Sequence, residues 1–183
     1  MRPENRSPHD IKQNIRREMR ARLSEVSADR RLRAGEAVRR RFAELDGKLF
    51  AFASLRNETD TWPLLHSRWQ AGLSVALPKV EPDGIRFFSV SGRHELAAGT
   101  LGIAEPVDSC PPISPASGDT ILVPGLAFTR EGLRLGRGGG YYDRFLASTA
   151  EDIFTVGVCF DFQLRASLPC DKHDVPVSEV FPA

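Results

Sequence analysis

Near the N-terminus, hydrophobic residues recur every three or four positions, as they do along one face of an amphipathic helix. Apolar side chains at four-residue spacing predict a first helix over residues 11–23, with Asp10 as its N-cap. The same pattern predicts a second helix over residues 27–45, and Gly47 follows its end. Most arginines of this region fall on the outward faces of the two helices.

The rest of the chain alternates short apolar runs with turns. Asp60 or Thr61 caps a third predicted helix, which ends near Gln70. The predicted strands span residues 48–54, 73–77, 85–90, 120–123 and 153–160. Their continuous apolar character is typical of strands buried on both faces. Strands that alternate with helices predict a single-domain α/β three-layer sandwich, in which helices flank a mainly parallel sheet.

Length and composition agree with one domain. The chain has 183 residues, of which 41% are hydrophobic and 27% charged. We expect residues 1–9 to form a flexible tail and residues 10–183 one domain. Because no apolar run approaches the ~20 residues of a membrane span, and no secretory signal is present, we expect a cytoplasmic protein with no membrane partner. Cys110, Cys159 and Cys170 lack zinc-site spacing and are expected to be reduced and structural.

Positive charge is concentrated near the N-terminus. Residues 1–42 contain 13 Lys and Arg against 6 Asp and Glu, whereas the remainder contains 12 against 18. A basic segment suits nucleic acid, an anionic membrane or a phosphorylated small molecule, and charge alone does not choose among them.

A glycine-rich loop is the most informative feature. The stretch GLRLGRGGGYYDRFL, residues 132–146, follows the fourth predicted strand and leads into a helix. Ligands of parallel sheets bind beyond the carboxyl ends of the strands. The glycines let several N–H groups turn toward one anion, and Arg134 and Arg137 add charged donors for phosphate oxygens. Neither G-x-x-x-x-G-K-[ST] nor G-x-G-x-x-G fits, so the sequence predicts a phosphate loop of another kind.

Asp143 would lie beside an anion bound to this loop. That position is unfavourable for a carboxylate unless a cation lies between the two, and Mg²⁺ is the usual mediator. Asp143 is therefore a candidate metal ligand. The alternative is that Asp143 interacts with the helix dipole or forms a salt bridge with Arg144.

The stretch LVPGLAFTREGLRLGRGGGYYDRFL, residues 122–146, closely resembles the signature of the 5-formyltetrahydrofolate cyclo-ligase family, also called 5,10-methenyltetrahydrofolate synthetase. Further family motifs follow in the same order along most of the chain. They are K-x-x-I-R at 12–16, E-T-D-T at 58–61, LPKV at 77–80, GIAEP at 102–106 and HDVPV at 173–177.

This resemblance implies a Rossmann-like fold similar to the NagB/RpiA/CoA transferase-like fold. It also implies a reaction in which ATP phosphorylates the formyl oxygen of 5-formyltetrahydrofolate, N10 attacks the activated carbon, and loss of phosphate leaves 5,10-methenyltetrahydrofolate and ADP. The implied cofactor is Mg²⁺, with ATP as co-substrate. The expected partners are ATP and 5-formyltetrahydrofolate with its polyglutamates, bound by a monomer. Phosphoryl transfer needs positioning and charge neutralisation more than a Ser/His/Asp set.

The resemblance further implies site residues. The implied ATP-binding residues are Lys12, Arg16, Arg134, Leu135, Gly136, Arg137, Gly138, Gly139, Gly140, Tyr141 and Tyr142. The implied substrate-binding residues are Ala53, Glu58, Arg137, Gly138, Gly139, Gly140 and Tyr141. The implied metal ligand is Asp143, and the implied catalytic residues are Arg137 and Tyr142. Without the resemblance, Lys12 and Arg16 would be interpreted as a solvated helix face, and Glu58 as a charge at a helix start.

Three positions depart from the family pattern. Many members have Lys in place of Gly139, and Asp is common in place of Thr129. The family often has Asp in place of Ser178, so metal coordination beyond Asp143 would depend on Glu179 or water.

Two other functions are compatible with parts of the sequence. A nucleic-acid-binding module would use the arginine-rich helices, but Phe42 is their only aromatic residue and the acidic remainder would repel a phosphate backbone. We therefore expect no nucleic-acid partner. The other alternative is a family-like fold that acts on a different formylated substrate or binds folate without turnover, and Ser178 favours it.

Overall fold

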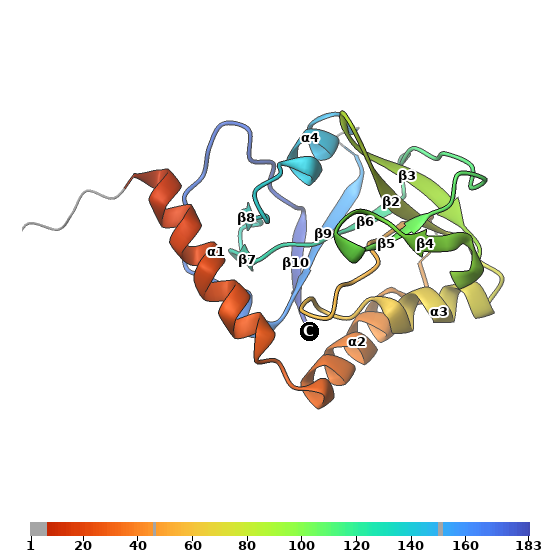
Figure 1. Ribbon diagram of the computed structural model, residues 1–183, viewed down its shortest axis with the longest axis horizontal. Helices are drawn as coiled ribbons and strands as arrows, with labels where there is room; N and C mark the ends of the chain where they lie inside the picture. Colours follow the sequence, from red (N-terminus) through yellow and green to blue (C-terminus); the bar gives the residue numbers. More distant parts are fainter. Residues whose placement is uncertain (1–6, 46, 150–151) are drawn as a thin grey trace, which may run out of the picture.

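The computed structural model describes residues 7–45, 47–149 and 152–183. A six-stranded sheet lies at its centre (Figure 1). Its strands, in spatial order, are β10 (Glu179–Pro182), β9 (Phe154–Cys159), β6 (Thr120–Val123), β1 (Leu49–Phe50), β2 (Val75–Glu81) and β3 (Gly84–Val90). The neighbours from β10 to β2 pair in parallel, and β3 pairs antiparallel with β2. The predicted mainly parallel sheet is confirmed.

Helices cover both faces of this sheet. The helices are α1 (Pro8–Ser24), α2 (Ala28–Phe42), α3 (Trp62–Gln70) and α4 (Tyr141–Ala147), with the short 3₁₀ helices η1 (Arg93–Glu95), η2 (Thr100–Gly102) and η3 (Asp161–Gln163). In Figure 1, α4 lies above the sheet and α2 and α3 lie below it. This arrangement agrees with the predicted three-layer sandwich.

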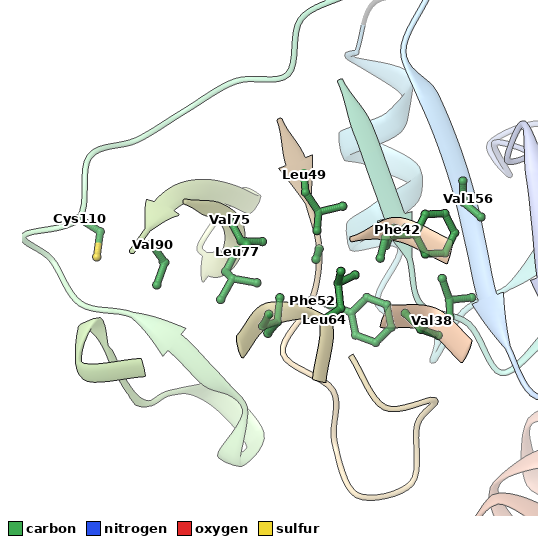
Figure 2. Packing of buried hydrophobic residues seen from close by; sticks show 14 residues of the cluster. Val38, Phe42, Leu49, Phe52, Leu64, Val75, Leu77, Val90, Cys110 and Val156 are labelled. Carbon is green, nitrogen blue, oxygen red and sulfur yellow. The ribbon is translucent and has the colours of Figure 1, made fainter. Parts of the chain in front are cut away.

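Successive strand residues point into different cores because side chains alternate across a sheet. In β1, Leu49 packs with α2 and α3, and Figure 2 shows it among Phe42, Leu64 and Val156. Its neighbour Phe50 packs on the opposite face, in the cluster that includes α4. Both faces of the strand are fully buried, which explains its continuous apolar sequence.

The first helix packs away from the central sheet. Its apolar residues join a separate cluster with the β7 (Ala127–Phe128) and β8 (Arg134–Leu135) ribbon that precedes the glycine-rich loop. Ser7 is the N-cap, and its hydroxyl accepts a hydrogen bond from the N–H of Asp10, whose carboxylate reciprocates. The predicted cap at Asp10 and start at residue 11 are wrong, and residues 7–9 of the predicted tail belong to this helix start. Residues 1–6 lie outside the described residues.

Other element boundaries also differ from the prediction. The strand predicted over residues 48–54 is shorter, because Ser54 donates its N–H to Thr61 Oγ1 and the chain leaves the sheet. The second strand is longer than predicted, since its hairpin with β3 continues to Gly84. The sequence did not predict β4 (Leu96–Ala98), β5 (Ala104–Pro106), the β7–β8 ribbon or β10. The second helix ends at Phe42, three residues before its predicted end at residue 45.

The three cysteines are free thiols, as predicted. Cys110 and Cys159 are buried, and burial raises the pKa of both, that of Cys159 to about 12. Cys170 is exposed, so the structural role predicted for it does not follow from burial. Within residues 7–45, 47–149 and 152–183, no helix is long and apolar enough to cross a bilayer.

Candidate functional site

The candidate site lies at the edge of the sheet where the parallel strands end. Residues 51–58 leave β1 at this edge, and residues 124–140 leave its parallel neighbour β6 there. The first helix packs against the ribbon of the second segment. Three stretches that are distant in the sequence therefore meet, and they contain all the site residues that the sequence implied before the start of α4.

The glycine-rich loop is anchored at its start and open along its length. Arg134 and Leu135 are buried, and Leu135 O accepts the N–H of Leu126 at 2.8 Å. Gly138 and Gly140 have φ angles of 115° and 66°, which residues with a Cβ rarely adopt. Among the described residues, none accepts a hydrogen bond from the N–H groups of residues 137–140. These donors are therefore available to an anion.

Arg134 and Asp143 form a largely buried ion pair. Arg134 Nη2 lies 2.7 Å from Asp143 Oδ1, and the two side chains are 4% and 19% exposed. Nη1 also donates to Pro124 O at 3.4 Å, whereas Nε is buried without a partner in the described part of the chain. Asp143 pairs with Arg134 and not with Arg144, whose Nη1 donates to Gly139 O. Asp143 does lie in the first turn of α4, as the helix-dipole alternative requires. Asp143 holds Arg134 toward the loop.

The geometry around Asp143 limits how a metal ion could bind. Its Oδ1 accepts from Arg134 and, at 3.4 Å, from the N–H of Val175, while Oδ2 has no hydrogen-bond partner in the described part. No cluster of three His, Cys, Asp or Glu residues suited to a metal occurs among the described residues. One carboxylate oxygen is therefore available, which suits Mg²⁺ when phosphate oxygens and water complete its shell.

Ser178 and Glu179, the two positions relevant to further metal coordination, both contact other residues in the structure. Ser178 Oγ lies 3.1 Å from Thr155 Oγ1 and accepts the Thr155 N–H, so it is engaged by β9. Glu179 lies 3.5 Å from Arg41 of α2. The expectation that Glu179 substitutes for a family aspartate is wrong for this conformation, because α2 and α4 lie on opposite faces of the sheet.

Glu58 and Arg137 meet across the site. Arg137 donates from Nη2 and Nε to Glu58 Oε1 at 2.8 and 3.1 Å, and Nη2 lies 3.4 Å from Asn57 Oδ1. Glu58 Oε2 accepts the N–H of Leu55 at 2.9 Å, which fixes the carboxylate on its own turn. The Glu58 side chain is 14% exposed and that of Arg137 is 38% exposed. The Arg137 guanidinium therefore engages Glu58 Oε1, and in this arrangement each group is occupied by the other.

Tyr142 is an unpartnered buried hydroxyl at this site. Its OH group is buried and makes no hydrogen bond to the residues described. Burial raises the pKa of Tyr142 well above its ordinary value, the Glu58 carboxylate raises it further, and Arg134 opposes this shift. The hydroxyl is therefore neutral and can donate a proton in a hydrogen bond. Buried polar groups without partners are rare in folded proteins and indicate a missing ligand or water.

Lys12 and Arg16, the two implied site residues of α1, differ in their partners. Arg16 Nε donates to Gly136 O at 3.0 Å. Lys12 Nζ lies 2.6 Å from both Asp171 Oδ2 and Asp174 Oδ2 and is almost fully buried. Burial lowers the pKa of Lys12, but the two carboxylates outweigh it and raise the pKa above its ordinary value. The ammonium group is therefore charged but already neutralised.

The remaining implied residues contribute mainly backbone or surface. Ala53 lies three residues after the end of β1 and is 4% exposed. The Leu135 side chain packs with the apolar residues of α1. Tyr141 is 39% exposed, with the Arg144 guanidinium 5.2 Å from its ring centroid. A Cβ at Gly139 would lie 2.7 Å from the Tyr141 ring, so a lysine at this position would require the ring to move.

Several contacts at the site were not predicted. Arg20 donates to Arg137 O at 3.2 Å, and its position one turn after Arg16 on the same helix face could have indicated it. The Asp171 and Asp174 partners of Lys12 are 159 and 162 residues away in the chain, and no local pattern points to them.

Comparisons with known proteins identify relatives of this chain. Residues 8–182 match the model of the 5-formyltetrahydrofolate cyclo-ligase family. The chain is 36% identical over 134 residues to the 5-formyltetrahydrofolate cyclo-ligase of Escherichia coli K12, covering 70% of this chain and 74% of the relative. The mouse enzyme of the same name is 27% identical over 189 residues, covering 94% and 93%.

A solved structure extends the likeness to the fold. The NMR structure of Aquifex aeolicus 5,10-methenyltetrahydrofolate synthetase superposes with a TM-score of 0.80 at 33% sequence identity, covering 93% of this chain and 88% of that one. Family match, relatives and fold agree over almost the whole length. This chain belongs to the 5-formyltetrahydrofolate cyclo-ligase family.

Proposed function

We propose that this site binds ATP against the glycine-rich loop and 5-formyltetrahydrofolate beside Glu58, and that it joins them in the reaction of its family. The family membership makes the chain an enzyme that converts 5-formyltetrahydrofolate to 5,10-methenyltetrahydrofolate. The single observation that carries the site assignment is the run of N–H groups at residues 137–140 with no acceptor among the described residues, in the loop that also contributes Arg134 and Arg137.

The loop suits the phosphates of ATP for three reasons. The N–H groups of residues 137–140 have no acceptor in the described part of the chain, the glycines leave room for close approach, and the arginines of the loop supply charge. Arg134 is held in place by Asp143, so it is pre-organised for phosphate. Arg137 is more exposed and paired only across the site, so it can transfer from Glu58 to a phosphate oxygen.

Glu58 suits the pterin ring of the folate. A carboxylate accepts hydrogen bonds from adjacent ring N–H and amino groups, and Oε1 becomes available when Arg137 moves to phosphate. Ala53 ends the buried segment that leads to this turn, where its backbone can approach the substrate. The proposal also includes folates with a polyglutamate tail, which would leave the site at its exposed edge.

The reaction then proceeds by two displacements. The formyl oxygen attacks the γ-phosphorus, the bond to the bridging oxygen of ATP breaks, and ADP leaves. The N10 lone pair attacks the formyl carbon, the carbon–oxygen bond breaks with its electron pair going to phosphate, and N10 loses its proton. The neutral hydroxyl of Tyr142 has no partner among the described residues. It donates a hydrogen bond to the oxygen that gains negative charge as the carbon–oxygen bond breaks.

Mg²⁺ belongs to this proposal as the cofactor that Asp143 would hold. The free Oδ2 of Asp143 and the adjacent phosphate site fit a hard cation that takes oxygen ligands. When bound, Mg²⁺ would neutralise the charge of the β- and γ-phosphates.

The charge distribution supports small molecules rather than nucleic acid as ligands. The arginines of α2 lie beside carboxylates, for example Arg31 beside Asp60 and Arg33 beside Asp29. The exposed large hydrophobic residues are scattered over different elements, which supports a monomer. A cytoplasmic location completes the proposal.

The alternative, a family-like protein that turns over another formylated substrate or only binds folate, is favoured by the engagement of Ser178 with Thr155. One assay separates the two. Purified protein is mixed with 5-formyltetrahydrofolate, ATP and Mg²⁺, and the near-ultraviolet absorbance of the methenyl product is followed while each component is omitted in turn. We expect a rise that requires all three. No rise from folded, ATP-binding protein would support the alternative.

A further inference from the structure

Two arginines of α1 hold carbonyl oxygens of the glycine-rich loop. Arg16 Nε donates to Gly136 O at 3.0 Å, and Arg20 Nη2 donates to Arg137 O at 3.2 Å. The two arginines are four residues apart, so they share one face of the helix. Below them, the buried apolar residues of α1 fix the helix against the ribbon that leads into the loop.

A third arginine holds the loop from its other end. Arg144 Nη1 of α4 donates to Gly139 O at 2.9 Å. Its guanidinium lies 5.2 Å from the ring centroid of Tyr141, which restricts its position. Gly140 has a φ of 66°, which favours glycine, and a Cβ there would lie 2.9 Å from Arg144 Nη1 and displace this guanidinium.

These contacts orient the free N–H groups. A peptide bond is planar and trans, so its C=O and the N–H that follows point in opposite directions. Because the carbonyls of Gly136 and Arg137 face α1, the N–H groups of Arg137 and Gly138 face away from it. The carbonyl of Gly139 faces Arg144, so the N–H of Gly140 points away from that guanidinium.

We propose that Arg20 and Arg144 are positioning residues that hold the loop in its anion-binding conformation through the carbonyls of Arg137 and Gly139. The family motifs assign a role to neither residue. The inference rests on the proposed function, because it takes ATP phosphate as the anion. It separates these arginines from Arg134 and Arg137, whose guanidinium groups would contact phosphate themselves.

The pairing of the other arginines supports this distinction. Arg30, Arg31, Arg33 and Arg41 of α2 each lie beside a carboxylate. By contrast, Arg20 Nη2 and Arg144 Nη1 donate to backbone oxygens of the loop. A charged donor that binds a neutral carbonyl fixes the orientation of that peptide group and neutralises no charge.

The test compares substitutions that remove the donor with substitutions that remove only the charge. Arg20→Met and Arg144→Met remove the donors, whereas Arg20→Gln and Arg144→Gln keep an amide donor. Arg17→Met is the matched control, because Arg17 is an exposed arginine of α1 whose hydrogen bond goes to Asn14. Dissociation constants for ATP and for 5-formyltetrahydrofolate are measured with each full-length protein, together with its melting temperature.

We expect each Met variant to weaken ATP binding about three- to tenfold, with little change in folate binding or melting temperature, and the Gln variants and the control to stay within about twofold of wild type. The inference is overturned if the Met variants bind ATP as wild type does, or if the Gln variants lose as much as the Met variants, which would indicate charge alone. A wild-type protein that binds no ATP would overturn the proposed function and this inference together.

Discussion

Arg137 and Glu58 are 79 residues apart in the sequence, yet Arg137 Nη2 lies 2.8 Å from Glu58 Oε1. One residue comes from the glycine-rich loop and the other from the turn after β1. The pair therefore connects the part of the site proposed for ATP with the part proposed for the folate. In this structure, Arg137 and Glu58 each bind the group that the other would offer to a substrate.

This pair predicts that the two substrates bind cooperatively. Movement of Arg137 to phosphate frees Glu58 Oε1, so a non-hydrolysable ATP analogue should tighten 5-formyltetrahydrofolate binding about fivefold or more. Arg137→Gln should remove this coupling, whereas Arg33→Gln, in an exposed pair with Asp29, should leave it intact. Calorimetric titrations with and without the analogue measure the effect. Equal coupling in wild type and Arg137→Gln would contradict the exchange of partners.

Tyr142→Phe should lower turnover without lowering stability. The hydroxyl is buried and has no partner among the described residues, so its removal should leave the free energy of unfolding unchanged or raise it by about 1 kcal/mol. If the hydroxyl donates to the reacting oxygen, kcat should fall about tenfold or more. Denaturant unfolding and steady-state kinetics measure the two quantities. Wild-type kcat in this variant would refute the catalytic role of Tyr142.

Asp143→Asn should raise the Mg²⁺ concentration needed for half-maximal activity and reduce turnover about a hundredfold. The amide oxygen can still accept from Arg134, so the fold should persist with a loss of about 1–3 kcal/mol. Asp29→Asn, which changes an exposed carboxylate on α2, is the control. A loss of activity with an unchanged Mg²⁺ dependence would show that Asp143 acts by holding Arg134 instead.

The ion pairs of Lys12 with Asp171 and Asp174 predict a contribution to the free energy of unfolding that depends on pH. Lys12 lowers the pKa of Asp171, and His173 and His9 act in the same direction, so this contribution is present above pH 3.8 and is lost as the pH falls through the lowered value. The pKa of Lys12 is raised, so its contribution is lost only as the pH rises beyond 10.5. The unfolding free energies of wild type and Asp171→Asn should therefore differ most between these limits. A difference that is largest at pH 3 would contradict this account.

The sequence predicted the sheet because β1, β6 and β9 are apolar on both faces, and burial alone imposes that pattern. It missed β10, since a four-residue edge strand that ends in Pro182 has no such pattern. It misplaced the start of α1 because Ser7 and Asp10 are both cap-type residues, and only the folded turn shows which of them is the N-cap.

Some features of the candidate site could also be predicted from local sequence, and others could not. Phosphate binding by residues 134–140 could be predicted locally, because glycines and arginines occur together in one loop. The partners of Arg137 and Lys12 lie far away in the chain, and only the family resemblance indicated Glu58. The spacing of Arg20 from Arg16 could have indicated its contact with the loop. The contact of Arg144 with Gly139 O depends on backbone geometry, to which no residue pattern points.

The fate of the formyl oxygen tests the central claim most directly. 5-Formyltetrahydrofolate labelled with ¹⁸O in the formyl group is converted with unlabelled ATP and Mg²⁺, and the released phosphate is analysed by mass spectrometry. If the loop directs the γ-phosphoryl group to the formyl oxygen, one ¹⁸O should appear in each phosphate released with product. Label found in water, with unlabelled phosphate, would contradict the account.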